Sequence, residues 1–164
     1  MHTLIIGFGS NLGDRLYYIN RAKQLMEENF GVPEKESSLF TSPPDGFESE
    51  NDFLNCCSLY KTMHPPEECL KITQDIERKI GRKEKSINGK FSSRKIDIDI
   101  LYYDNLTLKS EELTIPHYAI KERIFVLKPL KEIIPTFLDP FLKKTIDNLY
   151  ENCPKSTCIK KNSP

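Results

Sequence analysis

Two aspartates lie two positions apart in the segment from Arg94 to Asp104, RKIDIDILYYD. Isoleucine and aspartate alternate there with period two, which is typical of a β-strand because successive strand side chains point to opposite faces. Asp97 and Asp99 therefore share one face, with their Cα atoms about 7 Å apart. Two carboxylates at this spacing can bind one hard cation such as Mg²⁺, or two ions. An isolated D-x-D pattern is, however, more often a solvated strand face.

The same alternation predicts which side of this strand is buried. The face expected toward the core carries Ile96, Ile98, Ile100 and Tyr102, and the opposite face carries Asp97, Asp99, Leu101 and Tyr103. Like charges on one face repel one another, so we expect compensating positive charge nearby.

A basic segment directly precedes the two aspartates. Residues 78–95 contain eight basic side chains and one acidic side chain: Arg78, Lys79, Arg82, Lys83, Lys85, Lys90, Arg94, Lys95 and Glu84. Basic side chains beside a carboxylate pair favour a site for a polyphosphate and its metal ion, although a solvated charged loop is the alternative. Glycine, serine and asparagine in this loop also favour mobility, so it could close over a nucleotide and exclude water.

The whole chain is otherwise charge-balanced. It has 164 residues with a formal net charge of zero, which argues against a non-specific nucleic-acid binder. No apolar run approaches membrane-spanning length and the start lacks a basic signal-type region, so we expect a cytoplasmic protein. We expect one domain over residues 1–150 and a flexible tail over residues 151–164. The five cysteines form no C-x-x-C motif, which favours small buried side chains over disulfides.

The hydrophobic pattern predicts the elements that position the aspartates. Strands are expected over residues 2–9, 35–42, 53–62 and 94–104. One helix, with Leu16, Ile19, Ala22 and Met26 on its apolar side, is expected to end at Gly31, and another runs from Pro66 to Gly81. A further helical stretch covers residues 124–135. The order β-α-β-β-α-β is typical of a ferredoxin-like α+β sandwich, an antiparallel sheet with helices on one face, here with a C-terminal extension. The aspartates then face the open side, where Asn55 can line the same cleft.

Two other functions are compatible with parts of the pattern. The segment GFGSNLGD resembles a glycine-rich phosphate loop, but its glycines are one residue off the dinucleotide fingerprint, which weighs against a dinucleotide-dependent oxidoreductase. We interpret Gly7 and Gly9 mainly as requirements of the backbone. A non-enzymatic RNA-binding module of the same strand order predicts exposed aromatic residues and a basic sheet, whereas this sheet face carries two aspartates.

Five segments together resemble one enzyme family. They are GSNLGD, SPP.G, FLN, RKIDIDIL and LTIPHY...R.FVL.PL, between Leu4 and about Pro135. The family is 6-hydroxymethyl-7,8-dihydropterin pyrophosphokinase of folate biosynthesis. The resemblance implies a ferredoxin-like α+β fold and transfer of pyrophosphate from ATP, the co-substrate, to the hydroxymethyl oxygen of the pterin. AMP is released, and magnesium, expected as two ions, is required.

The resemblance also implies roles for individual residues. Asp97 and Asp99 are implied to bind magnesium and, with Arg82 and Arg94, to act in catalysis. The positions implied to contact ATP are Gln74, Arg82, Lys85, Phe91, Arg94, Ile100, His117, Tyr118 and Arg123. The positions implied to form the pterin pocket are Ser42, Pro43, Pro44, Asp45, Phe53, Asn55 and Phe125. The expected partners are these two small molecules, with no nucleic acid, no membrane and a monomeric state.

Three positions depart from the family pattern. Phe91 stands where tryptophan is often found, in a loop that is slightly longer than usual. Glu84 stands where a second loop arginine is common, so Lys83 or Lys85 is expected to substitute for it. Asp45 replaces a usual apolar residue of the pterin pocket. None of the three departures touches the aspartate pair.

Overall fold

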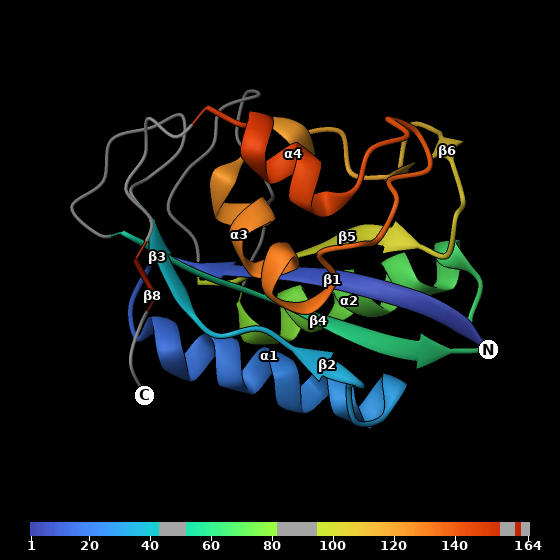
Figure 1. Cartoon of the computed structure of the whole chain (residues 1–164). Helices are drawn as coiled ribbons and strands as arrows, with labels where there is room; N and C mark the ends of the chain where they lie inside the picture. The colour runs from blue at the N-terminus through green and yellow to red at the C-terminus, as the bar shows by residue number, and fades with distance from the viewer. Residues whose placement is uncertain (43–51, 82–94, 155–159, 162–164) are drawn as a thin grey trace.

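One antiparallel sheet forms the centre of the molecule. The computed structural model describes residues 1–42, 52–81, 95–154 and 160–161 (Figure 1). Its sheet has the strand order β5-β1-β4-β3-β8, with β2 also paired to β4. The bounds are β1 His2–Ser10, β2 Lys35–Glu36, β3 Phe40–Ser42, β4 Phe53–Thr62, β5 Asp97–Tyr103 and β8 Lys160–Lys161. The predicted ferredoxin-like order is confirmed.

Two long helices cover one face of this sheet. They are α1 (Arg15–Phe30) and α2 (Pro66–Ile80). Asp14 caps α1 by accepting a hydrogen bond from the backbone N–H of Tyr17 at 3.1 Å, and Gly81 ends α2 with a left-handed φ of +111°. The predicted apolar stripe of α1 is buried except at Leu16, which is exposed. The turn that begins the helix leaves that side chain outside the core.

The second predicted strand is interrupted. Glu36 pairs with Ser58 and Phe40 pairs with Asn55, so three residues of one strand lie opposite two residues of β4. The Oγ atom of Ser37 accepts a hydrogen bond from the N–H of Cys57 at 2.9 Å within this irregularity. A continuous strand over residues 35–42 was therefore the wrong prediction, because an extra residue is accommodated as a bulge.

A second irregularity lies in β5 and changes which side its last residues face. Ile5 pairs with Tyr102 and Ile6 pairs with Ile100, which leaves Leu101 as an extra residue. Tyr102 consequently packs with Leu101 on one side of the sheet, and Tyr103 packs on the other side. The predicted faces are correct up to Leu101 and reversed for the two tyrosines, since one extra residue shifts the period-two alternation.

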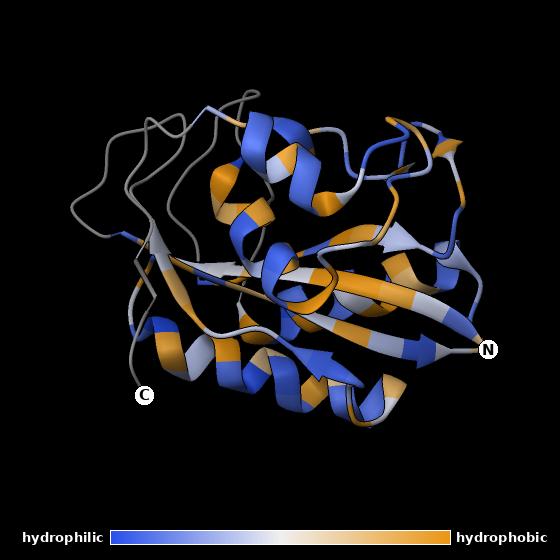
Figure 2. Cartoon of the chain, in the orientation of Figure 1, coloured by the Kyte–Doolittle hydropathy of each residue, from blue (hydrophilic) through white to orange (hydrophobic). Residues whose placement is uncertain are grey.

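The C-terminal third of the chain covers part of the opposite face. It contains the hairpin β6 (Leu108–Lys109) and β7 (Thr114–Ile115), the 3₁₀ helix η1 (Ile120–Glu122), α3 (Ile124–Ile133) and α4 (Ile146–Asn152). Figure 1 shows α3 and α4 on the side of the sheet opposite α1 and α2, and Figure 2 shows hydrophobic colour along the middle of β1 between these layers. The face that was expected to be open is therefore open only where α3 and α4 do not cover it. A second hydrophobic cluster lies between the sheet and the helices α3 and α4.

The cysteines and the C-terminal residues bear on further predictions about the chain. Cys56, Cys57 and Cys69 are buried free thiols, as predicted. The helix α4 ends at Asn152, and Lys160–Lys161 pair with Phe40 and Thr41, while the domain boundary at residue 150 stays a prediction. Among the described residues, no helix combines the length and apolar character that crossing a membrane requires.

Candidate active site

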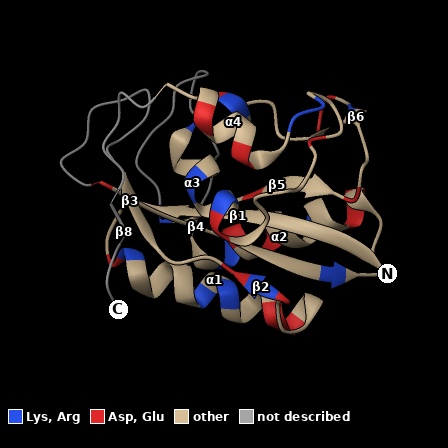
Figure 3. Ribbon diagram, viewed as in Figure 1, with Lys and Arg blue, Asp and Glu red and all other residues tan. Residues whose placement is uncertain are grey.

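A pocket lies over the three adjacent strands β5, β1 and β4. Gly7 and Gly9 of the central strand form its floor, where Gly9 lies between Asn55 and Asp97 and Gly7 lies between Cys57 and Asp99. A Cβ atom on Gly9 would lie 3.4 Å from Oδ1 of Asn55. Figure 3 shows that β1 carries no Lys, Arg, Asp or Glu, so the floor is uncharged, and the charged groups lie on neighbouring elements.

These glycines are functional candidates that the sequence interpretation missed. Gly7 and Gly9 were assigned to backbone needs, whereas both line the pocket. The signal was available: glycines two apart on a strand share a face, and a glycine within a strand often marks close approach of a ligand or another group. The strand order needed to place them between Asn55 and the aspartates was not evident from the glycines alone.

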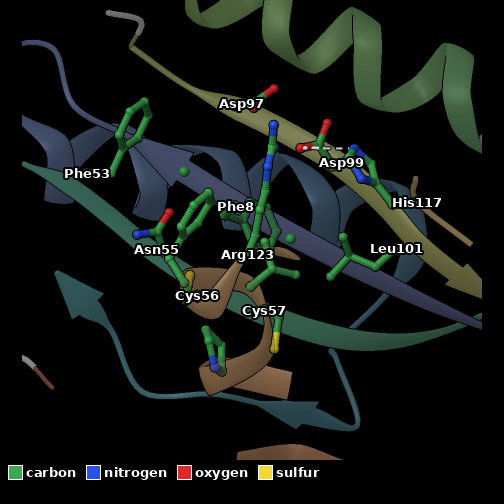
Figure 4. Close-up of a pocket in the computed structure, with 15 residues that line it drawn as sticks. Phe8, Phe53, Asn55, Cys56, Cys57, Asp97, Asp99, Leu101, His117 and Arg123 are labelled. Carbon is green, nitrogen blue, oxygen red and sulfur yellow. Dashed lines mark ion pairs between the residues drawn. The ribbon is translucent and has the colours of Figure 1, made fainter. Parts of the chain in front are cut away.

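The two aspartates point into this pocket from β5. Both are partly buried, and Figure 4 shows them side by side above β1. The isoleucines beside them, Ile96 and Ile98, are buried in the cluster on the opposite side of the sheet. This anchoring leaves the carboxylates as the pocket-facing groups of the strand, as the alternation predicts.

His117 approaches the same carboxylates from the segment after β7. Its backbone N–H donates to the carbonyl of Leu101 at 3.1 Å, and its Nδ1 accepts a hydrogen bond from the N–H of Ala119 at 3.2 Å. The neutral ring therefore carries its proton on Nε2. That atom lies 3.9 Å from Oδ2 of Asp99 (Figure 4).

A positive charge and an apolar wall come from the start of α3. Arg123 immediately precedes this helix, and in Figure 4 its side chain extends toward Asp97 and Asp99. Its guanidinium carbon lies 5.7 Å from the centroid of the Phe125 ring. Phe125, Val126 and Pro129 form the adjoining wall of the pocket.

The opposite end of the pocket is formed by β4. Asn55 is buried, and its Nδ2 donates to Oγ of Ser42 at 2.7 Å, which fixes the orientation of the amide. Phe53 lines the pocket two residues before it on the same face of the strand. Burial also raises the pKa of the Cys57 thiol, so this side chain is a neutral part of the wall.

The predicted site residues separate into four groups. The pocket brings together Phe53, Asn55, Asp97, Asp99, His117, Arg123 and Phe125. Ser42 is buried behind Asn55, and Tyr118 stacks on His117 while lining a neighbouring cavity. Gln74 is exposed on α2, and Ile100 is buried in the cluster between the sheet and the helices α1 and α2, so neither side chain lines the pocket. Pro43, Pro44, Asp45, Arg82, Lys85, Phe91 and Arg94 lie outside the described residues.

The residues of the pocket indicate the class of protein to which the chain belongs. A pocket that combines two carboxylates, an arginine and aromatic rings has the groups that a phosphate-transferring enzyme needs, and this conclusion rests on the site because the fold alone does not set the function. Residues 5–135 match the family model described as 7,8-dihydro-6-hydroxymethylpterin-pyrophosphokinase. The chain belongs to this family. The RNA-binding and oxidoreductase alternatives gain no support from the match.

Individual relatives agree with the family match. The chain is 37% identical over 159 residues to the 2-amino-4-hydroxy-6-hydroxymethyldihydropteridine pyrophosphokinase of Aquifex aeolicus, covering 96% of this chain and 97% of that protein. It is 38% identical over 153 residues to the folic acid synthesis protein FOL1 of Dictyostelium discoideum, covering 93% of this chain and 23% of that longer protein.

A solved structure shows the same fold. The crystal structure of Plasmodium falciparum HPPK-DHPS with pteroate superposes with a TM-score of 0.74 at 16% sequence identity. The match covers 92% of this chain and 44% of that chain, so this chain spans less than half of the bifunctional protein.

Proposed function

We propose that this chain transfers a pyrophosphate group from ATP to the hydroxymethyl oxygen of 6-hydroxymethyl-7,8-dihydropterin, releasing AMP, in folate biosynthesis. The family to which the chain belongs supports this activity. The structural observation that carries the proposal is one pocket that joins a paired-carboxylate end to an end with an oriented amide and aromatic rings. Such a pocket can hold a polyphosphate beside a flat heterocycle.

The pterin is proposed to bind at the end formed by Phe53, Asn55 and Phe125. Aromatic side chains pack well against a flat ring, and the two phenylalanines come from different elements that border the same pocket. One N–H of the Asn55 amide is used by Ser42, which leaves its other N–H and its carbonyl oxygen for the ring edge. Ser42 therefore acts through Asn55, and Pro43, Pro44 and Asp45 are proposed to complete this end.

The triphosphate is proposed to bind at the carboxylate end. Asp97 and Asp99 offer hard oxygen ligands that fit magnesium, whose remaining ligands are commonly phosphate oxygens and water. We propose two ions held by these residues, which when bound neutralise phosphate charge. Arg123 and the Nε2–H group of His117, which lie beside the aspartates, can donate to phosphate oxygens. The proposed nucleotide contacts further include Arg82, Lys85, Phe91, Arg94 and Tyr118. The side chains of Gln74 and Ile100 lie outside this pocket, so Gln74 is proposed to contact a part of the nucleotide beyond it, and Ile100 to contact the nucleotide through its backbone.

The reaction follows from this placement of the two substrates. The pterin hydroxyl oxygen forms a bond to the β-phosphorus of ATP, and the bond between that phosphorus and the oxygen bridging to the α-phosphorus breaks. AMP leaves with the electron pair, and the hydroxyl proton passes to water or to a pocket carboxylate. Catalysis comes mainly from positioning and charge stabilisation, as in other phosphoryl transfers. Arg82 and Arg94 are proposed to stabilise the developing charge.

The chain is further proposed to act as a cytoplasmic monomer on small molecules, without nucleic acid or membrane partners. The buried free thiols Cys56, Cys57 and Cys69 are compatible with a reducing compartment. Size-exclusion chromatography with light scattering tests the monomeric state directly.

Product analysis tests the activity. The protein is incubated with ATP, Mg²⁺ and the reduced hydroxymethylpterin, and the nucleotides are separated by chromatography. We expect AMP and the pterin diphosphate in equal amounts. ADP with a pterin monophosphate would indicate transfer of a single phosphate group, and no pterin-dependent nucleotide consumption would remove the proposed activity altogether.

A further inference from the structure

We propose that Glu77 is a positioning residue that holds the Asp97–Asp99 segment of β5 in its working geometry. The inference rests on the proposed function of the two aspartates. Glu77 lies near the C-terminal end of α2, outside the pocket, and only 6% of its surface is exposed. A carboxylate this buried requires strong hydrogen-bond partners, since desolvation of its charge is costly.

The contact of this carboxylate falls between the two aspartates. The Oε2 atom of Glu77 accepts a hydrogen bond from the backbone N–H of Ile98 at 2.9 Å. The Ile98 side chain is itself 2% exposed and packs in the cluster between the sheet and the helices α1 and α2. The one residue that separates Asp97 from Asp99 is therefore fixed through both its side chain and its amide.

The position of β5 in the sheet explains why such a contact is needed. β5 lies at one end of the strand order and pairs with β1 on one side only, within the described part of the chain. In an antiparallel pair, successive residues direct their backbone N–H groups alternately toward the neighbouring strand and away from it. Asp97 and Asp99 lie opposite Gly9 and Gly7, and Ile98 directs its amide away from β1 toward α2. Glu77 supplies the acceptor that a further strand would otherwise provide.

Loss of this acceptor would act on both aspartates together. A buried N–H group without a partner is unfavourable, so the Ile98 peptide would move to reach water or another acceptor. Movement of that peptide changes the directions of both neighbouring Cα–Cβ bonds. The pterin end, formed by β4 and the start of α3, would be left in place.

Three substitutions separate the acceptor function from general stability. Glu77→Gln keeps an acceptor oxygen at the same distance along the side chain, whereas Glu77→Leu keeps the size and removes the acceptor. Glu67→Leu, at an exposed position of the same helix, is the matched control. The measurements are amide hydrogen exchange of Ile98 by NMR, binding of Mg²⁺ with a non-hydrolysable ATP analogue by calorimetry, and the separate kcat and KM values.

We expect Glu77→Leu to speed exchange at Ile98, to weaken binding of the Mg²⁺–analogue complex at least tenfold, and to lower kcat. The KM for the pterin is expected to change less than twofold. Glu77→Gln and Glu67→Leu are expected to stay close to wild type in all these measurements. If Glu77→Leu does not fold, Glu77→Asp, whose carboxylate is one methylene too short to reach Ile98, is expected to show the same losses.

Different results would overturn different claims. Unchanged nucleotide binding and kcat in a folded Glu77→Leu or Glu77→Asp variant would overturn the role of Glu77 alone. Glu77→Gln as impaired as Glu77→Leu would also overturn it, because the acceptor would not be the relevant feature. If wild-type protein binds the analogue equally well with and without Mg²⁺, the proposed metal site fails and the inference fails with it.

Discussion

At the scale of single residues, the absence of a side chain at Gly9 shapes the pocket as much as the side chains that line it. Gly9 allows Asn55 and Phe53 to border a shared space, because a Cβ atom at this position would lie 3.4 Å from Oδ1 of Asn55 and 3.7 Å from Cδ1 of Phe53. These are ordinary contact distances for the free protein. The added methyl group would nevertheless occupy the floor of the pocket, on which the pterin ring is proposed to lie.

We therefore expect Gly9→Ala to fold with little change in the free energy of unfolding and to weaken pterin binding by roughly tenfold, equal to about 1.4 kcal/mol. Calorimetry with the pterin and a denaturant titration measure the two quantities. Unchanged pterin affinity, or a loss fully explained by unfolding, would show that Gly9 does not shape the ligand site.

Asn55 gives a second prediction at this scale. Asn55→Ala removes the amide that is held by Ser42 and proposed to pair with the ring edge, so pterin binding is expected to weaken by about 1–3 kcal/mol, the usual cost of an unmatched buried polar group. Binding of ATP with Mg²⁺ should barely change, because Asn55 lies at the other end of the pocket from the aspartates. Equal loss for both ligands in calorimetry would make Asn55 a structural residue.

At the scale of elements, the far end of β1 is tied to the end of β5 by Asp104. Its two oxygens accept hydrogen bonds from the backbone N–H of Thr3 at 2.7 Å and from the ring of His2 at 2.6 Å. Partial burial acts to raise the pKa of Asp104, but these hydrogen bonds outweigh it and hold the pKa below the ordinary value of 3.8. A lowered pKa means that the ionised form stabilises the fold above that pH, and this stabilisation is lost as the pH falls through and below 3.8.

Asp104→Asn tests this contribution without straining the backbone, because Asn tolerates the positive φ of +49° at this position. The side chain is 41% exposed, so we expect a loss of less than about 1 kcal/mol at pH 7. Denaturant titrations of both proteins from pH 7 to pH 3 should show a difference that persists well above pH 3.8 and shrinks as the pH falls through that value. A difference that stays constant over this range would contradict the assignment to the ionised carboxylate.

At the scale of the whole molecule, periodicity in the sequence was sufficient for the order of elements and for the shared face of Asp97 and Asp99. It failed at Tyr102 and Tyr103, and within residues 35–42, because each bulge adds one residue that the period-two pattern does not reveal. The covering of the second face by α3 and α4 was also missed. Their apolar residues predict a helix but not the layer on which it packs.

The candidate site was predictable to a different extent. The period-two pattern placed Asp97, Asp99 and Asn55 at one cleft, and the family resemblance added Phe53, His117, Arg123 and Phe125. The glycine floor and the contact of Glu77 depend instead on which strands and helices are neighbours. Strand neighbours are set by long-range pairing, which a local pattern does not encode. The same pairing places the proposed phosphate-binding and pterin-binding ends over one central strand.

The activity of the aspartate variants tests the central claim most directly. AMP formation is measured for wild type, Asp97→Ala and Asp99→Ala at saturating ATP and pterin over a range of Mg²⁺ concentrations, with unfolding curves for all three proteins. We predict that both variants fold normally and lose turnover by at least a hundredfold, equal to about 2.7 kcal/mol of transition-state stabilisation. Near-wild-type AMP formation by either variant at saturating Mg²⁺ would contradict the assignment of this pocket as the site of pyrophosphate transfer.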